Sequence, residues 1–173
     1  MQIIIIGSSG SGKSTLAKKI TNEFGCAHLD LDILAWKDLV PPERESLDVS
    51  MKRIKTFIDG QLNWVIEGGY SDLIEPVLDK DMILVYLNPG LDICLENCRN
   101  RPWEPHKYAS IEEQNKNLGM LLDWVADYWQ RQDTFSKLAH DKLFSNFSGS
   151  KVEIPSNFES SQVALYIKDL NKR

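Results

Sequence analysis

A glycine-rich octapeptide near the start of the chain constrains the fold more than any other feature. It reads Gly7-Ser8-Ser9-Gly10-Ser11-Gly12-Lys13-Ser14 and fits the pattern G-x-x-x-x-G-K-[ST]. Four isoleucines at positions 3–6 predict a buried strand before it, and an apolar stripe that starts at Leu16 predicts a helix after it. A turn without a ligand is the alternative. The agreement of loop, strand and helix favours a phosphate cradle, in which backbone N–H groups and the positive helix end face the anion.

Lys13 and Ser14 give this loop its expected chemistry. A lysine at this place reaches the β- and γ-phosphates of a nucleotide, and the hydroxyl that follows it joins the ligands of Mg²⁺. We therefore expect ATP to bind at Gly7 through Thr15, and Mg²⁺ to be held in part by Ser14.

Composition favours one α/β domain that spans residues 1–173. The chain has 173 residues, of which 42% are apolar and 26% charged, and these values are ordinary for a soluble globule with one substantial core. A net charge of −5 makes nucleic acid an improbable partner. The longest apolar run is far too short to span a membrane. The oligomeric state is left open.

The three cysteines favour a reducing compartment. Cys94 and Cys98 are four residues apart on a predicted helix, and Leu91 and Leu95 share their face. We expect them to be small core residues rather than metal ligands. An odd number of cysteines without a zinc-like cluster, on a chain that begins directly with a strand, is expected in the cytoplasm without a secretory leader.

Strands and helices alternate along the chain. Strands are predicted at 3–6, 27–30, 64–67, 82–87 and 151–154. The alternation predicts a doubly wound, five-stranded parallel sheet with right-handed crossovers. Ligands of such folds bind beyond the carboxyl ends of the strands, so the phosphate loop and the residues after the second and third strands should lie along one rim.

Acidic residues follow the second and third predicted strands. Asp30 and Asp32 point the same way if the chain stays extended. Next to Mg²⁺ and phosphate, Asp30 is expected to serve the metal and Asp32 to accept a proton from an acceptor hydroxyl. Helix capping is the alternative for these aspartates. Glu67 is expected beside the metal or the acceptor, and a solvated charge at the end of the strand is the alternative. Gly68-Gly69 either lets a substrate approach the backbone or forms only a tight turn.

Arginines supply the expected positive charge. The segment 101–110 begins with Arg101, contains two prolines and predicts a lid that closes over the phosphates. Arg131 is predicted at the end of a long helix that starts near residue 118. Arg44 and Arg53 lie in the segment after the second strand, and a surface role is the alternative for both.

The whole chain resembles the adenylate kinase-like group of P-loop kinases, which includes shikimate and gluconate kinases. Asp30-x-Asp32 resembles the paired aspartates of shikimate kinase, which serve magnesium and the substrate hydroxyl. Gly68-Gly69 resembles that family's substrate turn, and Arg101-Pro102 resembles the start of its lid. Arg131-x-x-x-Phe135-x-x-x-Ala139 resembles its substrate-arginine helix. This resemblance implies that Arg101 meets the nucleotide phosphates and that Arg131, together with Arg53 or Arg44, binds the substrate.

A second resemblance covers the second and third predicted strands and the residues that follow them. His28-Leu29-Asp30-Leu31-Asp32, Trp36 and Trp64-Val65-Ile66-Glu67-Gly68-Gly69-Tyr70-Ser71 resemble proteins known as adenylate kinase-related or DNA topology modulation proteins.

Together these features predict an ATP- and Mg²⁺-dependent kinase for an unidentified small molecule with a hydroxyl or phosphate acceptor. Its substrate-binding insert is expected at about 31–62 and its lid at about 101–110. A nucleoside monophosphate kinase and a regulatory nucleotide-binding ATPase that associates with DNA or proteins are the alternatives. The expected catalytic residues are Lys13, Asp30, Asp32, Arg101 and Arg131, and the expected substrate-binding residues are Asp32, Arg53, Glu67, Gly68, Gly69 and Arg131.

Overall fold

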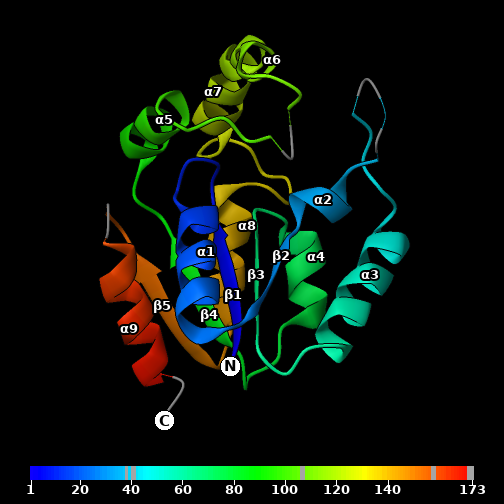
Figure 1. Cartoon of the computed structure of the whole chain (residues 1–173), viewed down its shortest axis with the longest axis vertical. Coiled ribbons are helices and arrows are strands. Elements are labelled where there is room, and N and C mark those ends of the chain that lie inside the picture. The colour runs from blue at the N-terminus through cyan, green and yellow to red at the C-terminus, as the bar shows by residue number, and fades with distance from the viewer. Residues whose placement is uncertain (38, 40–41, 106–107, 157–158, 171–173) are drawn as a thin grey trace.

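The computed structural model describes residues 1–37, 39, 42–105, 108–156 and 159–170. Within them, five parallel strands form one sheet in the order β2-β3-β1-β4-β5 (Figure 1). The strands are β1 (Gln2–Gly7), β2 (Ala27–Asp30), β3 (Trp64–Gly68), β4 (Ile83–Leu87) and β5 (Ser150–Ile154). The doubly wound parallel sheet predicted from the sequence is confirmed.

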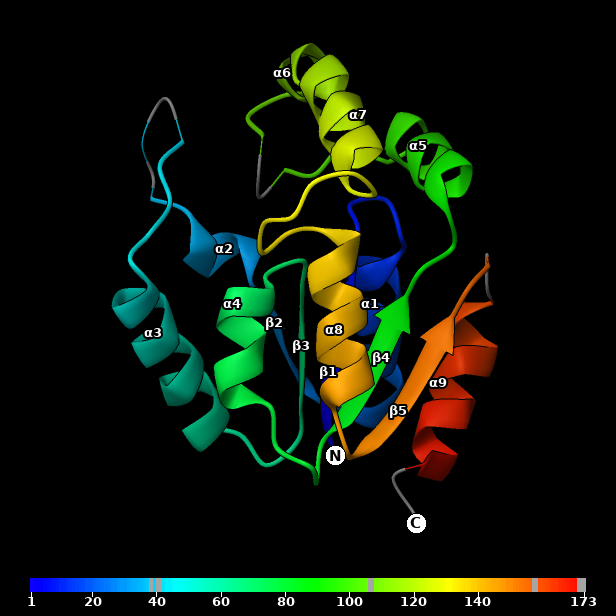
Figure 2. The same ribbon diagram turned by 180° about the vertical axis from the view of Figure 1, so that it is seen from behind.

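Helices cover both faces of this sheet. In Figures 1 and 2, α1 and α9 lie on one face, and α4 and α8 lie on the other with α3 beside them. The helices on the sheet are α1 (Lys13–Phe24), α3 (Leu47–Asp59), α4 (Ser71–Ile74), α8 (Lys137–Asn146) and α9 (Ser160–Leu170). The remaining ones are α2 (Asp32–Ala35), the 3-10 helix η1 (Glu75–Val77), α5 (Leu91–Arg99), α6 (Ile111–Lys116) and α7 (Leu118–Asp127).

The central strand β1 explains why its sequence is apolar without alternation. Ile4 and Ile6 pack toward α3, α4 and α8, whereas Ile3 and Ile5 pack toward α1 and α9. All four side chains are 0% exposed. A parallel strand that is covered on both faces needs apolar side chains at successive positions, because neighbours along it point to opposite sides.

A group of helices lies over the carboxyl ends of the strands. Both views place α5, α6 and α7 at the end of the molecule toward which β1 and β4 run (Figures 1 and 2). Cys94 and Cys98 on α5 share a small core with Val125 on α7, and all three cysteines of the chain are buried and free. The expectation that Cys94 and Cys98 are core residues is confirmed.

The long helix predicted to end at Arg131 is shorter than expected. α7 ends at Asp127, and Arg131 lies in the irregular segment that leads to α8. In the described part of the chain, no helix combines the length and the apolar content that crossing a bilayer requires.

Candidate active site

The phosphate loop joins β1 to α1 at the centre of the sheet. Gly10 has φ +75° and Gly12 has φ +95°, and this left-handed backbone favours glycine. A Cβ on Gly10 would also collide with the backbone oxygen of Cys94 and with its neighbour Cys98. Gly12 precedes the first turn of α1, where no side chain caps the helix among the described residues. The first N–H groups of α1 are therefore available to an anion.

Lys13 and Ser11 donate to the same carbonyl of this loop. The Lys13 ammonium donates to the backbone oxygen of Ser8 at 2.8 Å, and the Ser11 N–H donates to the same oxygen at 3.2 Å. The Ser11 hydroxyl is buried without a hydrogen-bond partner in the described structure. Two donors thus converge on one carbonyl at the place where the sequence predicts phosphate.

The register of the sheet brings the strand-end carboxylates together. Asp30 on β2 pairs with Glu67 on β3, and Glu67 pairs with Ile5 on β1, two residues before the phosphate loop. The Asp30 carboxylate accepts the backbone N–H of Asp32 at 2.9 Å, so it also fixes the start of α2. Asp30 and Glu67 therefore share the rim that carries Lys13, as the strand pattern predicts. Asp32 lies beside them, but it begins α2 and Leu31 before it is helical (φ −67°, ψ −18°), so the extended chain expected between the two aspartates is not present.

Glu67 is held as a buried carboxylate. Its side chain is 2% exposed, and Nε2 of His28 lies 3.6 Å from Oε1, which has no hydrogen-bond partner in the described structure. Burial alone raises the pKa of Glu67, but the neighbouring His28 and Ser14 side chains and the charge of Lys13 outweigh burial, so the pKa lies below its usual value. The buried Glu67 side chain is thus held as a carboxylate near the loop hydroxyl expected at the metal.

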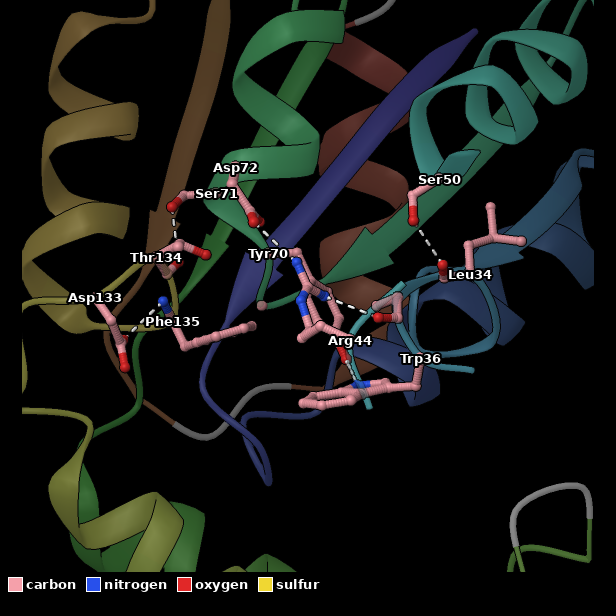
Figure 3. A network of polar contacts seen from close by, with 12 residues as sticks. Leu34, Trp36, Arg44, Ser50, Tyr70, Ser71, Asp72, Asp133, Thr134 and Phe135 are labelled. Atoms are coloured by element: carbon pink, nitrogen blue, oxygen red, sulfur yellow. Dashed lines mark hydrogen bonds and ion pairs between the residues drawn. The ribbon is translucent and has the colours of Figure 1, made fainter. Parts of the chain in front are cut away.

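A hydrogen-bond chain orients Asp32. The Trp36 indole N–H donates to the Tyr70 hydroxyl at 2.9 Å, and that hydroxyl donates to Oδ1 of Asp32 at 2.6 Å. Figure 3 shows Tyr70 and Trp36 within this network of polar contacts. Burial and the neighbouring Asp32 raise the pKa of the Tyr70 phenol, so it remains a protonated donor.

The turn Gly68-Gly69 is tight for reasons visible in its neighbours. A Cβ on Gly68 would lie 2.9 Å from Tyr70 and 2.9 Å from Leu31, and a Cβ on Gly69 would lie 3.3 Å from the backbone oxygen of Gly7. Gly68 thus makes room for the Tyr70 ring that reaches Asp32. Gly69 lets the turn approach the phosphate loop.

Arg44 lies among three aromatic rings. Its guanidinium carbon is 5.5 Å from the ring centre of Trp36, 4.9 Å from that of Tyr70 and 5.2 Å from that of Phe135. It donates to Asp72 at 2.8 Å, and Figure 3 shows Arg44 between Trp36 and Asp72. Stacking and pairing fix this cation beside the Tyr70–Asp32 contact.

Arg131 also lies near Phe135. Its guanidinium carbon is 3.4 Å from the ring centre of Trp124 and 5.9 Å from that of Phe135. Nε and Nη2 of Arg131 are buried without a hydrogen-bond partner among the described residues, although Asp133 is 3.6 Å from Nε. Burial lowers the pKa of Arg131. An arginine with unused donors is suited to bind an anionic group.

Arg101 and Arg53 lie outside this group of contacts. Arg101 pairs with Glu104 at 3.2 Å and contacts the Tyr108 hydroxyl at 3.4 Å, within the predicted lid. Residues 106–107 of that segment lie outside the described residues. Arg53 is exposed on α3 and lines a shallow surface hollow with Lys52. No described hydrogen bond or ion pair joins Arg53 to the rim.

A second buried chain of polar groups supports the Gly68-Gly69 turn. Nε2 of His140 contacts the Gly69 carbonyl at 3.2 Å, and its Nδ1 contacts the Tyr128 hydroxyl at 2.7 Å. The Tyr128 hydroxyl lies 3.2 Å from that of Tyr86, which donates to Asp141 at 3.0 Å. His140 is 0% exposed, and burial lowers its pKa to about 4.

Sequence reasoning gave no role to four residues of this site. Tyr70 and Trp36 belong to the segments that carry the second resemblance, so a signal for them was present. Asn97 donates to the Gly10 carbonyl at 2.8 Å, and His140 contacts Gly69 across 71 positions. Neither Asn97 nor His140 stands in a local pattern, because their partners are backbone carbonyls distant in sequence.

Comparison with known proteins gives one distant relative in sequence. The protein YqaC of Bacillus subtilis (strain 168), which is described as uncharacterized, is 28% identical over 134 residues, covering 73% of this chain and 71% of YqaC. No protein-family model matches the sequence.

Solved structures resemble the chain over almost its whole length. The YorR protein of Bacillus subtilis, in complex with phosphorylated GDP, gives a TM-score of 0.57 at 16% identity and covers 99% of this chain and 96% of YorR. A sugar kinase from Janibacter sp. HTCC2649 gives 0.57 at 12% identity, covering 99% and 94%. Shikimate kinase from Acinetobacter baumannii, in complex with shikimate, gives 0.52 at 17% identity, covering 98% and 91%. The expected adenylate kinase-like P-loop fold is therefore confirmed.

Proposed function

We propose that this chain is an ATP-dependent phosphotransferase that moves the γ-phosphate of ATP to a hydroxyl or phosphate of a small molecule. One observation carries the proposal. The sheet register sets a strand-end carboxylate pair, Asp30 and Glu67, level with each other on the rim where the loop of Lys13 begins. Phosphoryl transfer requires a phosphate cradle and an orienting carboxylate within reach of one another.

The residues of the rim divide this chemistry between them. In the proposal, backbone N–H groups of residues 7–15 and the Lys13 ammonium bind the phosphates of ATP. Asp32, oriented by Tyr70 at 2.6 Å, accepts the proton of the acceptor hydroxyl. Arg131 uses its unpaired donors to bind an anionic group of the acceptor or of the phosphate in transfer.

The residues beside the loop suit a magnesium ion. Oε1 of Glu67 is buried without a hydrogen-bond partner in the described structure, and Ser14 lies close enough to lower the pKa of Glu67. Ser14 and Asp30 would hold Mg²⁺ beside Glu67, since one or two oxygen ligands plus phosphates usually suffice. When bound, the ion supplies charge that neutralises the phosphates.

A screen of candidate acceptors with ATP and Mg²⁺ tests this proposal. ADP release is compared with and without each acceptor, in the wild type and in Asp32→Asn as the matched control. Shikimate, other hydroxy acids, sugars, nucleosides and nucleoside monophosphates cover the chemistry of the alternatives. Acceptor-dependent ADP release that Asp32→Asn loses supports a kinase. Nucleotide binding without stimulation by any acceptor class would instead favour the regulatory ATPase.

The predicted lid provides a second test. We expect Arg101 to leave Glu104 and contact the phosphates when nucleotide and acceptor are both bound, so Arg101→Ala lowers kcat more than it raises KM for ATP. Hydrogen exchange in residues 101–110, with and without a bisubstrate nucleotide analogue, measures the closure. Unchanged protection together with full activity of Arg101→Ala would refute the lid.

A further inference from the structure

The phosphate loop contacts α5 at Gly10. The side-chain amide of Asn97 donates to the backbone oxygen of Gly10 at 2.8 Å. The same glycine has no room for a side chain, because a Cβ there would overlap the backbone of Cys94 and lie 2.7 Å from Sγ of Cys98. Gly10 therefore lies flat on the helix, and Asn97 holds its carbonyl at that surface.

This contact determines where the next N–H group points. A trans peptide is planar, and its C=O and N–H point in opposite directions. If the Gly10 carbonyl faces Asn97 outside the loop, the N–H of Ser11 must face the inside. It does so in the structure, where it donates to the Ser8 carbonyl at 3.2 Å, the same carbonyl that Lys13 approaches at 2.8 Å.

The peptide has few other restraints within the loop. The Ser11 side chain is 2% exposed, but its hydroxyl has no hydrogen-bond partner in the described structure. The left-handed φ of Gly10, +75°, belongs to the residue type with the greatest backbone freedom. Without the Asn97 amide, the described hydrogen bonds leave only the one from the Ser11 N–H to the Ser8 carbonyl, at 3.2 Å, to keep this N–H turned toward the loop interior.

We propose that Asn97 is a positioning residue for nucleotide binding, which fixes the Gly10–Ser11 peptide so that the Ser11 N–H faces the phosphates. Asn97 itself touches no phosphate. It acts because a donor that is already oriented loses less conformational entropy when the anion binds. The inference rests on the proposed function only in so far as nucleotide binds at this loop.

Asn97→Leu is the sharpest variant. Leucine has a similar size and a higher helix propensity than asparagine, so α5 is retained while the donor is lost. Affinity for ATP with Mg²⁺ and for inorganic tripolyphosphate, measured by calorimetry, should fall roughly three- to tenfold, as expected for one hydrogen bond. Glu96→Gln, at an exposed position on the same helix, is the matched control and should bind like the wild type.

A second readout separates positioning from mere support of the fold. The amide resonance of Ser11 in a ¹H–¹⁵N spectrum should shift between the wild type and Asn97→Leu before any ligand is added, while the melting temperature of the free protein stays the same. Asn97→Ala, which adds no apolar bulk, should repeat the affinity loss and serves if the leucine variant folds poorly.

The outcomes separate the inference from the proposed function. Wild-type affinity in both Asn97 variants, or a loss of affinity that only follows a loss of melting temperature, overturns the role of Asn97 and leaves the kinase proposal standing. A wild-type chain that binds neither ATP nor tripolyphosphate overturns the proposed function, and the inference falls with it.

Discussion

The phosphate loop and the proposed acceptor side of the rim are built in opposite ways. The loop is a continuous run of eight residues, and its donors are backbone N–H groups together with Lys13. The acceptor side combines single side chains from four separate segments, in which Asp32, Tyr70, Arg44 and Arg131 are brought together by Trp36, Trp124 and Phe135. The first design is local and depends on few side chains. The second depends on long-range packing, so single substitutions there should change chemistry and leave nucleotide binding intact.

The strongest way to break this comparison is to remove the candidate base. Asp32→Asn should lower turnover with the acceptor found in the screen about 10²–10⁴-fold, because the amide cannot accept the hydroxyl proton. Its affinity for ATP should change little, and calorimetry measures this beside the rate. If Asp32→Asn and Asp30→Asn both keep full turnover, the chemistry lies elsewhere and Glu67 is the next candidate.

The reverse pattern is expected at Lys13. Lys13→Ala removes a charge-assisted contact worth about 1.5–3 kcal/mol, so ATP affinity should fall roughly tenfold or more. The acceptor side should keep its structure, which the near-ultraviolet circular dichroism of its aromatic cluster reports. Unchanged ATP affinity in a folded Lys13→Ala variant would contradict the assignment of the loop.

The pH dependence of stability shows how the Gly68-Gly69 turn depends on the buried His140. Its pKa is about 4 in the folded chain, against an ordinary value of 6.5, because burial disfavours the charged ring. The unfolded chain therefore binds more protons between these values, and the free energy of unfolding falls as pH drops from about 6.5 toward 4. This residue alone should cost about 2 kcal/mol between pH 7 and pH 5. Urea unfolding of the wild type and His140→Gln measures the difference, and equal pH slopes would refute it.

The smallest effect is expected at Tyr70. Tyr70→Phe keeps the ring against Arg44 and Phe135 but removes the donor to Asp32, so kcat should fall roughly three- to tenfold while KM for ATP is unchanged. Tyr166→Phe, at an exposed position on α9, is the control and should leave kcat unchanged. An equal rise of KM for ATP in Tyr70→Phe would show that the two sides of the rim are not separate.

This contrast also explains what the sequence could and could not predict. Local periodicity and short motifs predict three features correctly. These are the position of the phosphate loop, the acidic residues at the ends of β2 and β3, and the burial of Cys94 and Cys98. The sequence predicts Arg131 at the end of a helix, because the apolar spacing continues to Trp129. In the structure α7 ends earlier, at Asp127. The stacking of Arg131 on Trp124 depends on this early end and leaves no periodic signal.

Long-range contacts decide where the two arginines after the second strand lie. Arg53 is the substrate-binding arginine expected from the sequence, with Arg44 as the alternative, since both follow the second strand. The structure gives Arg44 three rings and an acidic partner, whereas Arg53 lies on the exposed face of α3. Only the fold decides which of two neighbouring arginines turns inward, because the partners of Arg44 come from residues up to 91 positions away.

The buried series of polar groups that runs from the Gly69 carbonyl to Asp141 has one hydrogen too few to form all of its hydrogen bonds. A carbonyl only accepts, so Nε2 of His140 carries the hydrogen at Gly69, and the neutral ring must then accept the proton of Tyr128 at Nδ1. Tyr86 gives its own proton to Asp141, which leaves the two hydroxyl oxygens of Tyr86 and Tyr128 at 3.2 Å with no hydrogen between them. One added proton on His140 would complete every link, because Nδ1 would then donate to Tyr128 and the Tyr128 hydroxyl would be free to donate to Tyr86. The charge of His140 and the hydrogen bonding of Tyr86 beside Asp141 are therefore coupled through two tyrosines.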